Sequence, residues 1–195
     1  MSQLANRLFD AGCVQFGTFT LKSGIISPVY VDLRLLVSHP PLLRYVAHAL
    51  AEVARELTFD RIAAIPYAGL PIGTALALEM DRPLIYSRQQ IKAHGTRRAI
   101  EGTFESGETA LVVDDVLSRG GSKLEAIALL EAAGLIVRDV LVLVDREQGG
   151  AEELAQRGYR LHAVLQFTNV LDALRESTRI TPAQYAEVMA YLRRS

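Results

Sequence analysis

Short apolar runs alternate with amphipathic segments along most of the chain, and this alternation limits the possible folds more than any other feature. The runs are apolar on both faces, as strands inside a covered sheet are, and they lie at 61–66, 84–86, 110–113, 140–144 and 161–165. Segments with helical spacing of apolar residues precede or separate most of them, at 40–57, 70–80, 122–133 and 151–156. This order predicts a doubly wound α/β domain with a mainly parallel sheet covered by helices on both faces.

The first 35 residues do not follow this rhythm, because a helical segment at 2–11 leads into a turn-rich, extended stretch at 16–28. We expect them to form a small hood over the ends of the sheet strands. Near the other end, Thr181 and Pro182 are a cap and a first-turn proline that begin a helix. We therefore predict three parts: the N-terminal hood at 1–35, the core at 36–180 and a C-terminal helix at 181–195.

The charges of the 195-residue chain nearly cancel, with 21 Lys and Arg against 22 Asp and Glu. Such a surface has no overall field that would collect nucleic acid or an anionic membrane, so any anion site must be local. No stretch approaches the roughly 20 apolar residues that cross a bilayer. Cys13 is the only cysteine, which excludes an intrachain disulfide, and residues 1–13 do not resemble a secretion signal. A cytoplasmic location is expected.

The stretch 108–134 carries the strongest chemical signal. An apolar run ends in Asp114 and Asp115, a loop with two glycines follows, and an amphipathic helix begins near Ser122. Carboxylates at the end of a strand can accept hydrogen bonds from ribose hydroxyls, and backbone N–H groups at a helix start can bind a phosphate. The plainer interpretation is that the acidic pair ends a strand and the glycines turn the chain. The motif has neither the lysine of a nucleotide P-loop nor the spacing of a dinucleotide fingerprint.

The segment VVDDVLSRGGS resembles the signature by which type I phosphoribosyltransferases hold phosphoribosyl pyrophosphate. Four further segments occur in the order found in the orotate phosphoribosyltransferases, namely FGTFTLKSGIISPVYVDLR, IPYAGLP, RQQIKAHGTRRAIEG and DREQGG. The resemblance implies that orotate and phosphoribosyl pyrophosphate are converted to orotidine 5'-monophosphate and pyrophosphate in pyrimidine biosynthesis. It also implies Mg²⁺ as helper ion, held mainly by the diphosphate and ribose hydroxyls rather than by a protein cage.

The resemblance implies roles for individual residues around the phosphosugar. Asp114 and Asp115 would hold the ribose hydroxyls, Asp115 acting in catalysis. The substrate-binding segment that follows them, whose last five residues would enclose the 5-phosphate, comprises Val116, Leu117, Ser118, Arg119, Gly120, Gly121 and Ser122.

Other positions would form the base and pyrophosphate sites. Lys22 would lie near the base and the reacting carbon, Tyr30 and Val31 would line the base pocket, and Tyr67 would lie by the pyrophosphate. Arg146 would pair with the carboxylate of orotate, which its planar guanidinium fits through two parallel hydrogen bonds. Simpler interpretations remain open, with packed side chains at 30 and 31, a solvated Lys22, and Arg146 as a surface partner of Glu147 or Glu152.

The stretch 88–98 carries five basic residues and no acidic one, and these are Arg88, Lys92, His94, Arg97 and Arg98. Such a run is usually a solvated face. The resemblance instead implies a lid whose cations stabilise the leaving pyrophosphate, with Arg88 binding substrate. Lys92 and His94 are the candidate catalytic residues of this loop, His94 as proton donor to pyrophosphate. In the family the loop reaches into the neighbouring subunit, so a homodimer sharing loop 88–102 is implied.

Two positions depart from the family pattern. Gln89 stands where the family has a lysine that contacts pyrophosphate, and Arg119 stands where a small residue is common. We hypothesise that Arg119 supplies the missing charge, in which case Arg119→Ala would lose most activity, whereas normal kinetics would refute the idea. Two alternatives therefore stay open. One is a phosphoribosyltransferase for another base, which would not need Arg146, and the other is a ligand-binding regulator without turnover.

Overall fold

A six-stranded sheet forms the centre of the protein, whose computed structural model describes residues 2–20, 24–88 and 99–193. The strands of this sheet are β3 (Arg61–Ala64), β4 (Leu84–Ser87), β5 (Ile100–Glu101), β6 (Thr109–Leu117), β7 (Ile136–Asp145) and β8 (Arg160–Gln166). Their order in the sheet is β5-β4-β3-β6-β7-β8. All neighbours are parallel except β4 and β5, which are antiparallel. The predicted α/β fold with a mainly parallel sheet is confirmed.

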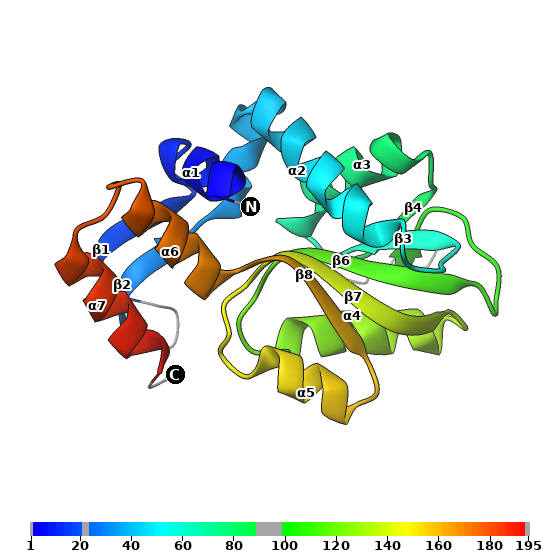
Figure 1. The fold of residues 1–195 in the computed structure, drawn as a ribbon. Coiled ribbons are helices and arrows are strands. Elements are labelled where there is room, and N and C mark those ends of the chain that lie inside the picture. The colour runs from blue at the N-terminus through cyan, green and yellow to red at the C-terminus, as the bar shows by residue number, and fades with distance from the viewer. Residues whose placement is uncertain (1, 21–23, 89–98, 194–195) are drawn as a thin grey trace.

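Helices cover both faces of this sheet (Figure 1). One face carries α2 (Pro40–Ala54) and α3 (Gly69–Met80), and the other carries α4 (Gly121–Ala132) and α5 (Gly150–Gln156). Successive side chains of a strand point to opposite faces, so Leu111 joins the core under α2 and α3 while Val112 joins the core under α4. Burial on both faces is the reason that the strands are continuous apolar runs in the sequence.

A smaller unit lies beside one end of the sheet (Figure 1). It consists of α1 (Ser2–Asp10), β1 (Val14–Thr20), β2 (Ile26–Val31), the 3-10 helix η1 (Leu33–Ser38), α6 (Phe167–Glu176) and α7 (Pro182–Leu192). The stretch predicted as extended contributes to an antiparallel hairpin, in which Val14 of β1 pairs with Val31 of β2. The hood is therefore built from both ends of the chain.

Helix α6 falls in the range 36–180, which the sequence assigns to the core, but it packs against the N-terminal helix. Leu8 of α1 and Leu171 of α6 belong to one apolar cluster, and the Ser177 hydroxyl donates a hydrogen bond of 2.7 Å to Asn6 Oδ1. The sequence analysis does not identify α6, although Phe167, Val170, Leu171 and Leu174 recur at helical spacing. The division into three parts stays a prediction.

The predicted start of the C-terminal helix is confirmed. The Thr181 hydroxyl accepts a hydrogen bond of 3.2 Å from the Gln184 amide, and the Gln184 side chain accepts one of 2.9 Å from the Thr181 amide. This reciprocal capping box precedes Pro182 in the first turn of α7. Within residues 2–20, 24–88 and 99–193, no helix has both the length and the apolar character needed to cross a membrane.

The sheet topology brings three loops to one edge. Because β3, β6 and β7 are parallel neighbours, their carboxyl ends meet there, with Ala64 opposite Val113 and Leu117 opposite Asp145. The connections that leave this edge lead to the starts of α3, α4 and α5. Ligands of open α/β sheets bind at such an edge, outside the carboxyl ends of the strands. This edge contains the predicted acidic pair and the glycine loop.

Candidate active site

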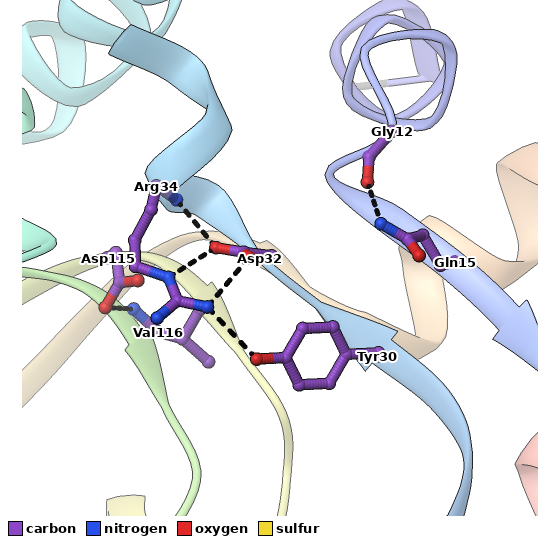
Figure 2. A network of polar contacts seen from close by, with 7 residues as sticks. All are labelled: Gly12, Gln15, Tyr30, Asp32, Arg34, Asp115 and Val116. Carbon is purple, nitrogen blue, oxygen red and sulfur yellow. Dashed lines mark hydrogen bonds and ion pairs between the residues drawn. The ribbon is translucent and has the colours of Figure 1, made fainter. Parts of the chain in front are cut away.

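The acidic pair lies near the carboxyl end of β6. Asp114 is buried with 5% exposure, whereas Asp115 is partly buried. Oδ1 of Asp114 accepts a hydrogen bond of 2.9 Å from the Asp115 amide. Oδ1 of Asp115 accepts one of 2.7 Å from the Val116 amide, which Figure 2 shows. Backbone groups therefore hold both carboxylates in defined orientations beside the loop that begins at Ser118.

The carboxyl group of Asp115 has an unusual protonation equilibrium. Its pKa is raised from 3.8 to about 7, first by burial and second by the neighbouring charge of Asp114. The hydrogen bond from the Val116 amide and the charge of Lys123 act against this rise. A carboxyl group that titrates near neutral pH can serve as either a hydrogen-bond acceptor or a donor, and such groups concentrate at functional sites.

Lys123 is a site residue that the sequence analysis missed. Its Nζ atom lies 2.6 Å from Oδ2 of Asp114 and donates a hydrogen bond of 2.6 Å to the Val116 carbonyl. The Lys123 and Asp114 side chains are each only 7% exposed. A signal existed, because Lys123 shares the buried stripe of α4 with Ala126, Ile127 and Leu130, where a charged residue is unusual.

The glycine loop connects the acidic pair to the start of α4. Arg119, Gly121 and Ser122 are exposed, Ser118 is partly buried, and Gly120 is buried. The Gly120 amide donates a hydrogen bond of 3.0 Å to Oε2 of Glu153, a residue of α5 that the sequence analysis did not select. Helix α4 begins at Gly121, and no side chain in the described part of the chain caps its first turn.

The start of α5 packs directly against this loop. The Gly150 amide donates a hydrogen bond of 3.1 Å to the Ser118 carbonyl. A Cβ atom at position 150 would lie 2.8 Å from that carbonyl oxygen and 2.8 Å from Cγ of Leu117. Glycine at 150 therefore permits the close approach that brings Glu153 to the loop.

Arg88 and Tyr67 occupy the neighbouring loops. Arg88 forms an ion pair with Glu101, and together with Ser122 it lines a cleft of about 320 Å³ between the sheet edge and α4. Tyr67 follows β3, its side chain is 71% exposed, and the peptide bond from Pro66 to Tyr67 is cis. Both residues are thus near the carboxyl edge of the sheet.

Arg146 follows β7 and is buried, with 8% exposure. Its amide donates a hydrogen bond of 2.8 Å to the Leu117 carbonyl, which ties it to the glycine loop. Within the described residues, Nε and Nη2 of its guanidinium have no hydrogen-bond partner. Burial lowers the pKa of Arg146, while a hydrogen bond with Tyr191 of α7 acts to raise it. This burial does not fit a surface ion pair with Glu147, and it leaves a planar cation with free donors.

The hairpin residues predicted for the base pocket differ in their surroundings. Val31 packs against the main apolar core, as the simpler interpretation expected. Tyr30 stacks on Phe19 with ring centroids 5.5 Å apart, and its hydroxyl accepts a hydrogen bond of 3.1 Å from Arg34. Arg34 donates hydrogen bonds of 2.7 and 2.8 Å to the two carboxylate oxygens of Asp32 (Figure 2), and these bonds lower the pKa of Asp32.

Three predicted residues cannot be placed. Lys22, Lys92 and His94 lie outside the described residues, as does Gln89. Their roles stay predictions. The structure therefore brings together the acidic pair, the glycine loop and Arg146, and it adds Lys123 and Glu153 to them.

The fold and this edge of the sheet define the class of protein. Residues 35–158 match the family model of the phosphoribosyl transferase domain, and the chain belongs to this family. Its relatives place it among the orotate phosphoribosyltransferases. The chain is 38% identical to an orotate phosphoribosyltransferase of Pyrococcus furiosus over 88% of its own length and 95% of that protein.

Two further proteins extend the likeness. The chain is 42% identical over 97% of its length to the bifunctional enzyme PyrF/PyrE of Nostoc, of which it covers 40%. It superimposes on a UMP synthase of Leishmania donovani with a TM-score of 0.93 and 45% identity, covering all of this chain and 42% of that one. The chain thus spans about two fifths of these longer relatives and nearly the whole of the Pyrococcus protein.

Proposed function

We propose that the protein is an orotate phosphoribosyltransferase, which converts orotate and phosphoribosyl pyrophosphate to orotidine 5'-monophosphate and pyrophosphate. The choice of orotate rests on Arg146. Its guanidinium is buried beside the glycine loop, and two of its nitrogens have no hydrogen-bond partner in the described chain. A buried cation with unused donors is costly unless a ligand supplies the acceptors. The carboxylate of orotate is such an acceptor, and it matches the guanidinium in shape.

The reaction is a displacement at the anomeric carbon of the ribose. A ring nitrogen of orotate loses its proton and forms the new bond to this carbon, while the bond from the carbon to the pyrophosphate oxygen breaks and pyrophosphate leaves. The sugar has cationic character in the transition state. Asp114 and Asp115 accept hydrogen bonds from the ribose hydroxyls, and the amides of loop 118–122 hold the 5-phosphate. These contacts orient the sugar, so the base and the leaving group lie on opposite faces.

Magnesium is part of the proposal. In the described part of the chain, no three His, Cys, Asp or Glu side chains are grouped closely enough to hold a metal ion. We expect the diphosphate and the ribose hydroxyls to provide most of the oxygen ligands that this ion prefers, with water completing the set. When bound, the ion offsets the negative charge that develops on pyrophosphate.

The proposal extends to the assembly and the location of the enzyme. Loop 88–102 would close over the site of a second subunit, so that a homodimer shares its two sites and water is excluded during transfer. Lys92 and His94 would then act on the pyrophosphate of the partner's site. The expected location is the cytoplasm, a reducing compartment that suits both the use of phosphoribosyl pyrophosphate and the free thiol of Cys13.

The deciding experiment measures the consumption of orotate by the purified chain with phosphoribosyl pyrophosphate and Mg²⁺. Uracil is the matched control, because it is the same base without the carboxylate. We expect turnover of orotate and far less of uracil, with the difference abolished in Arg146→Met. Equal use of both bases would point to a different pyrimidine substrate, and tight ligand binding without turnover would point to a regulator.

A further inference from the structure

Lysine is rare in this chain, which has only Lys22, Lys92 and Lys123. Lys123 is the one that the structure describes, and it lies in the first turn of α4, the helix that follows β6. Its ammonium group is within 2.6 Å of both Oδ2 of Asp114 and the carbonyl oxygen of Val116. These two contacts connect the helix to the two residues that flank Asp115 in the sequence.

The contacts fix the orientation of the Asp114 carboxylate. Lys123 binds one carboxylate oxygen, Oδ2, and the Asp115 amide binds the other, Oδ1, at 2.9 Å. Because Lys123 is also anchored to the Val116 carbonyl, rotation of the Asp114 side chain would break two interactions in a buried environment. The Asp114 carboxylate is thereby held in one orientation.

Lys123 also changes the charge of the site. Two adjacent ionised carboxylates would repel a ligand that carries a phosphate and a diphosphate. One positive charge 2.6 Å from Asp114 offsets half of that repulsion at a depth where solvent does not screen it. A buried ion pair is weak evidence of added stability, since apolar residues of similar volume often serve as well. The contact of Lys123 with the acidic pair therefore favours a role in the site.

We propose that Lys123 is a positioning residue for the sugar-phosphate substrate, which orients Asp114 and offsets its charge. This inference rests on the proposed function. It predicts that Lys123 acts on the binding of phosphoribosyl pyrophosphate and not on the binding of orotate, whose proposed partner is Arg146.

The test is steady-state kinetics of the full chain with Mg²⁺, varying each substrate at saturation of the other. For Lys123→Met we expect the KM for phosphoribosyl pyrophosphate to rise by at least about tenfold, since a charge at this distance shifts ionic equilibria by one or more pKa units. The KM for orotate should not change. Lys123→Arg, which keeps the charge, should recover most of the loss.

Ile127→Val is the matched control, because Ile127 occupies the same buried stripe of α4 but is not part of the site. It should leave both KM values unchanged. If wild-type protein shows no turnover, the proposed function is at fault. If wild type is active and a folded Lys123→Met has wild-type constants, the positioning role alone is refuted.

A second measurement covers the case in which Lys123→Met does not fold. Wild-type protein labelled at lysine Cε with ¹³C has three lysine signals, one for each lysine of the chain. Lys22→Arg and Lys92→Arg, measured without ligand, assign two of them and leave the third to Lys123. Saturation with phosphoribosyl pyrophosphate should shift the Lys123 signal, whereas orotate alone should not. An unchanged Lys123 signal at saturation would overturn the inference.

Discussion

Gly69, at the start of α3, lies so close to the acidic pair that a Cβ atom on it would be 2.9 Å from Oδ1 of Asp114 and 3.0 Å from the Val113 carbonyl oxygen. The helix and the end of β6 therefore touch where the proposed sugar site begins. Only glycine allows this contact without a shift of one element.

We expect Gly69→Ala to displace Asp114 and to raise the KM for phosphoribosyl pyrophosphate, with a loss of stability of about 1–3 kcal/mol from overpacking. Gly73→Ala is the control, because its Cβ would be 2.6 Å from Cβ of Ala64 and would strain the same helix away from the site. Kinetics and thermal unfolding of both variants separate the effects. Identical kinetic losses in the two variants would show that only stability matters.

The raised pKa of Asp115 gives a pH dependence whose sign can be worked out. With a pKa of about 7 instead of 3.8, the folded protein keeps this proton over a range in which the unfolded chain has lost it. The contribution to stability is therefore complete below pH 3.8 and is lost as the pH rises through about 7. Wild type should lose stability relative to Asp115→Asn across this window, measured by denaturant unfolding. A constant difference between the two would contradict the assignment.

The same carboxyl group should control substrate binding in the opposite sense. The ionised form accepts hydrogen bonds from ribose hydroxyls, so affinity for phosphoribosyl pyrophosphate should fall as the pH drops through about 7. Binding measured by calorimetry at several pH values checks this. Asp115→Asn should bind more weakly and with a flatter pH profile.

Arg146 should contribute to orotate binding without adding to the stability of the fold. Because two of its buried guanidinium nitrogens lack partners in the described chain, Arg146→Met should leave the free energy of unfolding unchanged or higher. Orotate binding should weaken by about 2–5 kcal/mol through loss of the paired charge. Arg160→Met is the contrast, because Arg160 pairs at 2.9 Å with the buried Asp139 and its loss should lower stability alone. A stability loss in Arg146→Met without any effect on orotate would refute the proposed role.

Glu153 should compete with the 5-phosphate for the glycine loop. Its carboxylate accepts the hydrogen bond of the Gly120 amide at 3.0 Å, and an incoming phosphate would need that donor. We expect Glu153→Ala to lower the KM for phosphoribosyl pyrophosphate several-fold, in line with about 1 kcal/mol for one hydrogen bond. Glu152→Ala, one residue earlier and exposed, should have no such effect. If both variants raise the KM, Glu153 supports the loop instead of competing for it.

Much of this architecture could be predicted because its signals are local. The apolar run before Asp114 is continuous since β6 is covered on both faces, and the cap at Thr181 needs only the next three residues. The loop between β6 and α4 was also recognisable, because the carboxylates and the amides are adjacent in the chain. Helix α6 was missed although its spacing was regular, since it follows β8 without a turn signal.

The sequence by itself determined the α/β fold class, the acidic pair, the glycine loop and the family resemblance. Tertiary structure alone decided that Gly69 touches Asp114, that Glu153 reaches Gly120, and that Arg146 is buried. Lys123 is an intermediate case. The apolar stripe of its helix was visible in the sequence, but its ion-pair partner Asp114 was not. The physical reason is that a pattern records which face of an element is buried, whereas partners depend on how separate elements pack together.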